Sequence, residues 1–471
     1  METRLNSGGQ QVAFGSQGAE NEAVAEEAGA RAPAHAARPR ARSHAARPRA
    51  RITGTPFTVA KPIRGSVDEL EKLLRSIGND LRHETVLNLR ELELVHFLRW
   101  VIVPGAEKRQ GPHLLVFGSD YDGTLEEHLS ELWERAGRGA GLDRIYAFCE
   151  GAPTFATPAD LVRYFSSDLL PAAAAYRGTR DRSVRQIRGE DELQQTLAGY
   201  VDGPHRGSVS SDPQRALAEH VRKLESPPVD LDEELLDTTT LLSKLAHGPA
   251  VWLLVVAGVG LLLVPGLLFF GLVWVRERTE PEDASAQGEP DAGKLGQLKG
   301  REDYKVQNQL THLVPIKPGM LRMFSLRLVL WAIDLLAKNY FDRGNLGGIP
   351  SIHYARWMIL KEQRQLLFFS NFDGSWESYL GDFVDQAASG LTGVWSNTVG
   401  FPRSLFLVLR GARDEERFKN WTRAHQVETQ IWYSAYPNLS VQNVNENTVL
   451  RRGLAERPPE GEPLRAWLRT L

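Results

Sequence analysis

Two short segments of the chain each carry a histidine, an arginine and a tryptophan in the same order. They read VHFLRW (residues 95–100) and IHYARW (residues 352–357). Histidine exchanges protons near neutral pH and arginine binds anionic groups, so both segments hold residue types suited to catalysis. Both segments are predicted strands, in which residues three apart point to opposite faces, so the histidine and arginine of one segment are not expected to converge. One of each pair should face the interior.

An interior histidine or arginine is a functional candidate because an unpaired buried charge is costly. The candidate catalytic residues are His96, Arg99, His353 and Arg356. The alternative is that these side chains form hydrogen bonds or salt bridges that fix the pairing of the strands.

Two aspartates lie directly before a glycine, where a predicted strand passes into a predicted helix. This position favours an Asx turn or a cap that accepts hydrogen bonds from free backbone N–H groups nearby. The alternative is that polar and aromatic residues of these junctions line the mouth of a cavity. The candidate ligand-binding residues are Asn371, Asp373, Trp376, Trp357 and Asp122.

Motifs with a known mechanism do not stand out. The sequence shows no phosphate loop, nucleophile elbow, Rossmann glycine pattern or zinc spacing. The single cysteine, Cys149, excludes an internal disulfide and a cysteine-rich zinc site. The net charge of −3 does not favour nucleic acid as a partner. Neither a metal nor a cofactor is predicted, and whether the chain is an enzyme stays open.

The paired segments belong to an internal repeat. LVFGSDYDG (115–123) resembles LLFFSNFDG (366–374), and Tyr176–Leu197 aligns without a gap with Tyr433–Leu454. A helix-like run follows the aspartate-glycine pair in each case. Blocks that recur in one order indicate that one α+β unit occurs twice.

Each unit is predicted to follow the ferredoxin-like order βαββαβ. In the first copy we expect strands at Phe57–Ile63, Val95–Val103 and His113–Ser119, a helix capped by Ser66, and a last strand near Ser183. Such a sheet leaves one apolar face bare. The fold class is therefore α+β, with two repeats that stack as a pseudo-dimeric α+β barrel.

A long apolar segment lies between the two copies. Residues 249–275 carry no charge and exceed the roughly 20 residues that cross a bilayer. Pro265-Gly266 interrupts the run, so it is either one kinked span or a hairpin. Cations after the segment place the C-terminal half in the cytoplasm, at the inner membrane of a bacterium. A hairpin would put both copies on one side, as a pseudo-dimer requires, whereas a span would separate them.

The remaining segments complete the predicted organisation. The helix expected at 320–340 is apolar around most of its circumference, so it is either buried under neighbours or in contact with the membrane surface. The arginine-rich tail is either solvated or bound to anionic lipid. The predicted boundaries are 1–52 for this disordered tail, 53–202 for the first repeat, 203–248 for a linker with a short helix, 249–275 for the membrane segment, 276–304 for an acidic flexible linker and 305–471 for the second repeat.

The duplicated unit resembles the dimeric α+β barrel superfamily, which includes dye-decolourising peroxidases and chlorite dismutases. The motifs IHYARW and FFSNFDGSWESYLGDF are similar to those of uncharacterised bacterial membrane-associated proteins. The superfamily resemblance implies an oxidoreductase with haem, but the residues depart from that pattern. The peroxidases carry Gly-x-x-Asp-Gly, whereas Gly118 is separated from Asp122-Gly123 by one residue more and Phe369 replaces this glycine in the second copy. The late histidine, His425, has no recognisable haem motif around it.

The sequence is consistent with three functions. The leading prediction is a membrane-anchored protein that binds an apolar or amphipathic small molecule or a lipid. The alternative is an oxidoreductase of the barrel superfamily, either peroxidase-like or free of cofactor. The third is a structural interaction module. The expected partner is the lipid bilayer, and a second copy of the chain is a further candidate that would form a homo-oligomer.

Overall fold

The protein is described here by a computed structural model that covers residues 56–81, 83–106, 111–203, 212–233, 265–280, 292–341, 345–456 and 461–471. These residues belong to one compact unit. The predicted tail at 1–52 and residues 249–264 of the apolar segment lie outside the described residues.

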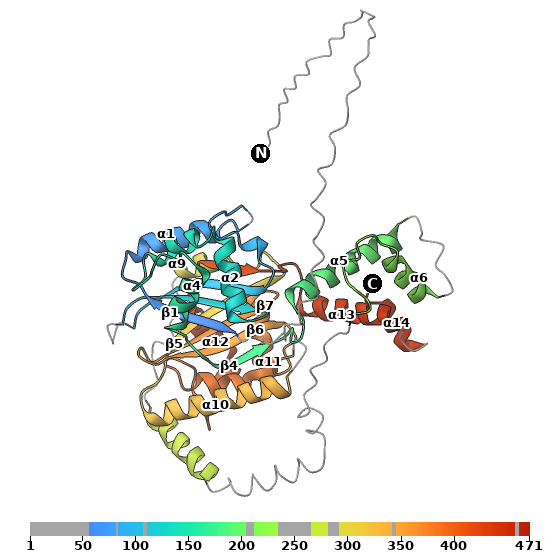
Figure 1. The fold of residues 1–471 in the computed structure, drawn as a ribbon. Coiled ribbons are helices and arrows are strands. Elements are labelled where there is room, and N and C mark those ends of the chain that lie inside the picture. The colour runs from blue at the N-terminus through green and yellow to red at the C-terminus, as the bar shows by residue number, and fades with distance from the viewer. Residues whose placement is uncertain are drawn as a thin grey trace, which may run out of the picture. The chain divides into compact units, whose positions relative to one another are not determined.

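Two four-stranded antiparallel sheets form the centre of this unit (Figure 1). The first sheet has the order β1 (Phe57–Pro62), β3 (Leu114–Tyr121), β2 (Val95–Val103) and β10 (Ile431–Ser434). The second sheet has the order β5 (Gln307–Pro315), β7 (Gln365–Asp373), β6 (Ile352–Leu360) and β4 (Ala172–Arg177). Both sheets therefore place the first, third and second strands of one half of the chain side by side.

The fourth strand of each sheet comes from the other half of the chain. In the first sheet β10 pairs with β2, with Tyr433 opposite Leu98. In the second sheet β4 pairs with β6, with Tyr176 opposite Ala355. The last strand of each half follows several helices, and in the second half also two short strands, and it pairs with the sheet of the other half.

The predicted position of the last strand near Ser183 is wrong. Ser183 instead caps a helix, because its side chain accepts a hydrogen bond from the N–H of Gln186. The true strand, β4, reads AAAAYR. Alanine has a low preference for strands, so this segment gives a weak signal in the sequence and is held by pairing with β6.

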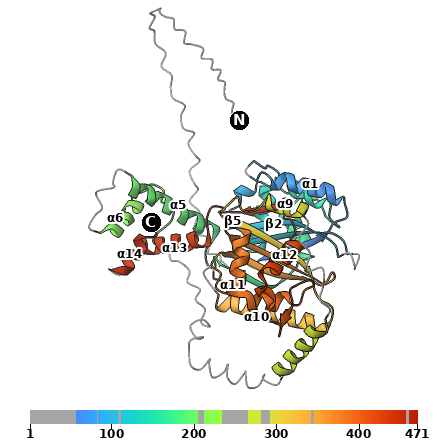
Figure 2. The ribbon, with the colours of Figure 1, turned by 180° about the vertical axis from the view of Figure 1, so that it is seen from behind.

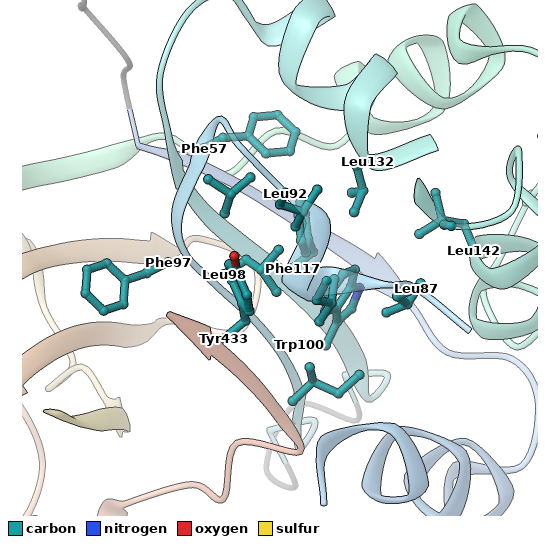
Figure 3. Close-up of a cluster of buried hydrophobic side chains, with 14 of the residues drawn as sticks. Phe57, Leu87, Leu92, Phe97, Leu98, Trp100, Phe117, Leu132, Leu142 and Tyr433 are labelled. Carbon is teal, nitrogen blue, oxygen red and sulfur yellow. The ribbon is translucent and has the colours of Figure 1, made fainter. Parts of the chain in front are cut away.

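Helices cover the outer side of each sheet. α1 (Val67–Gly78) begins at Ser66, whose side chain caps it as predicted. The apolar side chains of α2 (Leu125–Arg135), α3 (Ala140–Tyr146) and α4 (Pro158–Ser166) share one core with the first sheet. Figure 3 shows part of this core, in which Trp100 and Phe117 lie together while Phe97 points away from them. Figure 2 shows the second sheet with its helices, which are α10 (Met320–Asn339), α11 (Trp376–Trp395) and α12 (Glu415–His425).

Four further helices form a separate apolar cluster beside the sheets. α5 (Val184–Asp202) follows β4, and α13 (Val441–Ala455) follows β10, so the helices after the exchanged strands pack against each other. Their cluster includes α6 (Pro213–Arg222), close to the predicted linker helix, and α14 (Glu462–Leu468). The short elements are η1 (Leu89–Glu91), β8 (Ser404–Leu405), β9 (Leu409–Arg410) and η4 (Gly411–Arg413).

The predicted linker at 276–304 contains helical residues where the structure describes it. Residues 265–279 are helical, and α9 (Ala292–Lys299) forms a second helix. Glu277 accepts hydrogen bonds from the backbone N–H groups of Phe406 and Leu407. Glu277, at the start of the predicted linker, is therefore bound to the folded unit.

His128 on α2 is a buried histidine whose ring nitrogens have no hydrogen-bond partner within the described part of the chain. Its ring stacks on Tyr121 with 4.3 Å between centroids. Burial lowers the pKa of His128 from 6.5 to about 3. The unfolded chain therefore binds a proton below about pH 6.5 that the folded chain does not, and stability is lost as the pH falls.

We expect His128→Phe to raise the free energy of unfolding by about 1 kcal/mol at pH 7, because two unsatisfied nitrogens are removed. At pH 5 the gain should grow by roughly 2 kcal/mol, since the wild type alone loses stability between pH 6.5 and pH 5. Urea unfolding at the two pH values measures this, with His83→Phe as the control on an exposed histidine. An equal gain at both pH values would contradict the burial argument.

Candidate functional site

The two candidate histidines lie in matching surroundings where the two halves of the chain meet. His96 on β2 and His353 on β6 are fully buried, and each sits at a break in strand register. His96 Nε2 is 2.9 Å from Asp122 Oδ1, and His353 Nε2 is 2.7 Å from Asp373 Oδ1. A carboxylate only accepts hydrogen bonds, so Nε2 carries the proton in both rings.

Each aspartate also reaches the helix that follows an exchanged strand. Asp122 Oδ2 accepts a hydrogen bond of 2.7 Å from the N–H of Val184, the first residue of α5. Asp373 Oδ2 accepts the same bond from Val441, the first residue of α13. The predicted role in a local turn is therefore wrong, because the helix ends that these aspartates satisfy lie more than 60 residues away.

Aromatic rings join the two histidines into one buried cluster. Phe97 and Tyr354, the residues after the histidines, lie 5.4 Å apart between ring centroids. Tyr436 is 5.9 Å from the His96 ring and 6.1 Å from the His353 ring, and its hydroxyl is 2.9 Å from His96 Nδ1. We call His96, Phe97, Asp122, His353, Tyr354, Asp373 and Tyr436 the central cluster.

Charge in the central cluster is compensated internally. Burial lowers the pKa of His96 below its usual 6.5, although Asp122 partly offsets this. Burial alone would raise the pKa of Asp122, but His96 and Arg177 outweigh it and the pKa of Asp122 lies below 3.8. Arg177 on β4 donates to Asp122 Oδ1 at 3.1 Å. His96 is therefore neutral and lies beside a charged Asp122. Both ring nitrogens of His96 already have hydrogen-bond partners.

The two candidate arginines cross between the sheets in opposite directions. Arg99 of the first sheet donates to the carbonyls of Leu310 and Ser370 in the second sheet, at 3.0 and 2.9 Å. Arg356 of the second sheet donates to the carbonyls of Phe57 and Ser119 in the first sheet, at 2.9 and 3.0 Å. Both arginines therefore form structural hydrogen bonds, but these bonds fix one sheet against the other and not the pairing of neighbouring strands.

The space between the sheets is filled by side chains. The Phe369 ring lies 4.6 Å from the Arg99 guanidinium and 5.8 Å from that of Arg356. A Cβ atom at Gly118 would come within 3.0 Å of this ring, so the glycine in one copy makes room for the phenylalanine in the other. Further apolar residues of both sheets complete this layer, including Val101, Val116, Met358 and Leu367.

The predicted ligand-binding residues do not gather at one cavity mouth. Asn371 Oδ1 accepts hydrogen bonds from Arg99 and from Trp432. Trp376 lies under the Arg423 guanidinium, 3.5 Å from the ring centroid. Trp357 packs on Phe368 in the core on the helix side of the second sheet. Asp122 and Asp373 belong to the central cluster, and sequence reasoning missed Arg177 and Tyr436 because nothing in the sequence marks them as its neighbours.

The residues present do not fit a haem site. Both oxygens of Asp122 are occupied by hydrogen bonds from His96, Arg177 and the N–H of Val184. His425 packs against Trp421 and donates from Nδ1 to the carbonyl of Trp421 at 2.9 Å. Within the described ranges, no group of three or more His, Cys, Asp or Glu side chains is placed to hold a metal ion.

A second candidate site is an exposed apolar surface. One side of α10 is buried, with Leu326, Leu330 and Ala337 in the core next to β4. The opposite side is exposed and carries Phe324 (57% exposed) and Trp331 (60% exposed). The helix at 265–279 is exposed in the same way. We define the apolar face as Leu267, Leu268, Phe270, Leu272, Val275, Phe324, Leu328, Trp331 and Leu335.

The two helices of the apolar face are held together by specific contacts. Arg322 of α10 is 2% exposed and donates two hydrogen bonds to Glu280, of 3.0 and 2.7 Å. Phe269 packs edge-on against Phe324, with 5.9 Å between ring centroids. The exposed cations Arg327 and Lys338 lie on the outer side of α10. Burial under neighbouring elements, one of the two alternatives predicted for this helix, therefore applies to one side of it, and the other side is exposed in the described part of the chain.

No helix in the described ranges combines the length and apolarity needed to cross a bilayer. Of the predicted membrane segment, residues 265–275 belong to the helix of the apolar face, and the rest lies outside the described residues.

Comparison with known proteins gives no relative. No family model matches the chain, and no match was found among curated proteins or solved structures.

Proposed function

We propose that the protein is a membrane-attached lipid-binding protein that lays its apolar face on a bilayer. This proposal rests on the exposure of large apolar side chains on two helices that are joined by hydrogen bonds. Soluble monomers rarely leave a contiguous patch of this kind in water, and such patches mark sites of contact with proteins or membranes. The face continues in sequence into the uncharged residues 249–264, which favours lipid over a protein partner.

The residue composition of the apolar face also favours lipid as the partner. Trp331 and Phe324 occur among leucines, with Arg327 and Lys338 beside them, which is the composition of helices that lie in a membrane interface. Apolar side chains would enter the boundary between headgroups and acyl chains, while the cations stay at the phosphate level.

We also propose that the two halves descend from one α+β unit and form a pseudo-dimeric barrel of the kind the sequence resembles. Two features support this: the matching strand orders of the two sheets and the matching histidine, aspartate and helix-start triplets. Because Phe369 and the arginines fill the space between the sheets, we place lipid binding on the outer apolar face.

Vesicle partitioning tests the function. We expect Trp331→Glu combined with Phe324→Glu to lower the partition constant for phosphatidylcholine vesicles at least about 100-fold, since each side chain contributes roughly 1.5 kcal/mol or more when buried in lipid. Val449→Glu is the matched control, because Val449 is 47% exposed on α13 and lies outside the apolar face.

A second measurement tests whether the apolar face itself contacts the lipid when the protein binds vesicles. An environment-sensitive fluorophore on Phe324→Cys should shift to the blue and become shielded from iodide when vesicles are added, whereas the same fluorophore on Val449→Cys should not. Native Cys149 is buried, and burial raises the pKa of its thiol to about 12, so it should not compete for the label. Equal behaviour of the two labelled positions would refute the proposal.

A further inference from the structure

We infer that both halves of the protein lie on the same side of the membrane. This inference rests on the proposed membrane attachment and goes beyond it, because it assigns the topology. Its main basis is the exchange of strands between the two halves, which does not involve the apolar face.

Backbone pairing is the first constraint. β4 precedes the apolar segment and pairs with β6, which follows it, from Ala172 opposite Met358 to Arg177 opposite Tyr354. β10 follows the segment and pairs with β2, which precedes it. Strands within one sheet lie about 4.8 Å apart, whereas a bilayer core of about 30 Å would separate halves on opposite sides.

Buried polar contacts are the second constraint. Arg356 of the second half forms an ion pair with Asp120 of the first half, with 3.0 Å between nitrogen and oxygen. Both side chains are at most 3% exposed. Gly178 donates its N–H to the carbonyl of His353, and Ala435 donates to the carbonyl of His96. Separating the halves would leave all these groups without partners, and buried polar groups without partners are strongly destabilising.

Length is the third constraint. The helix of residues 265–279 packs on α10 through Arg322 and Phe324, so its apolar residues belong to the surface of the folded unit. Residues 249–264 of the apolar segment number only 16, fewer than the roughly 20 apolar residues that a bilayer-crossing segment needs. The packing of residues 265–279 on the folded unit therefore favours attachment of the protein to one leaflet.

Labelling of single cysteines in the full chain tests the topology. Lys72→Cys lies on α1 of the first half and Glu416→Cys on α12 of the second half, and both positions are exposed. Each variant is expressed in bacteria and treated with a membrane-impermeant maleimide, once in spheroplasts and once in inverted inner-membrane vesicles. The unsubstituted chain, with only buried Cys149, gives the background, and detergent gives full labelling.

We expect both cysteines to react in the same preparation and to be protected in the other. Reaction of one in spheroplasts and of the other in inverted vesicles would overturn the inference while leaving lipid binding intact. Failure of the chain to remain with either membrane preparation would overturn the proposed function, and the topology with it.

Discussion

Replacing Arg356 with methionine is expected to lower the free energy of unfolding by about 3–5 kcal/mol, because it leaves a buried carboxylate without its cation. Arg356 Nη2 is 3.0 Å from Asp120 Oδ2, and Asp120 is 2% exposed. The substitution also removes the donors to the carbonyls of Phe57 and Ser119. Methionine retains much of the apolar stem, so loss of volume contributes little. Urea unfolding followed by circular dichroism measures the change.

The double variant Arg356→Met with Asp120→Asn tests whether the unpaired charge of Asp120 causes the loss of stability. If the unpaired charge dominates, the second substitution should restore a large part of the lost stability, giving a coupling energy above about 1 kcal/mol. Arg64→Met is the control, since its pairing with Glu150 is exposed and should matter little. A loss of equal size in Arg64→Met would show that the position of Arg356 between the sheets is not what makes it important.

Replacing Asp122 with alanine is expected to cost about 3–4 kcal/mol, because one carboxylate serves three partners. It accepts hydrogen bonds from His96, from Arg177 and from the first N–H of α5. Loss of the helix cap alone costs about 1 kcal/mol. The remainder comes from leaving Arg177 buried without an anion. Asp414→Ala, which removes an exposed cap from α12, should cost only about 1 kcal/mol.

The stability that the charge of Asp122 contributes should decrease at acidic pH. The pKa of Asp122 is lower in the folded state than the usual 3.8, so its charge stabilises the fold above about pH 4. That stability is lost as the pH falls through the lower, folded-state pKa. The difference between wild type and Asp122→Ala should thus shrink as the pH falls below about 4. A difference that did not shrink below about pH 4 would contradict the charge argument.

Local signals in the sequence predicted several elements well. Val95–Val103 was expected as a strand and is β2, because alternating branched and aromatic residues suit a sheet. Ser66 was expected to cap a helix and does so, since capping depends on residues three apart in the chain. His96 and His353 each lie at the second position of a strand, on β2 and β6 respectively.

Long-range pairing could not be predicted in the same way. Nothing in AAAAYR or IWYS indicates that β4 and β10 change sheets, because strand pairing depends on partners hundreds of residues away. The aspartates looked like local caps, and only the tertiary structure shows that they satisfy helices which start after the exchanged strands. Neither Arg177 nor Tyr436 carries a local signal of its role.

Strands such as β2, the helix cap at Ser66 and the largely apolar character of α10 could be predicted from the sequence, since each depends on neighbours within a few turns of chain. Three features are visible only in the folded chain: the sheet that each fourth strand joins, the binding of the candidate arginines to backbone across the interface, and the side of α10 that is exposed. The physical reason is that burial and partner choice are properties of the packed chain, which no local stretch of residues specifies.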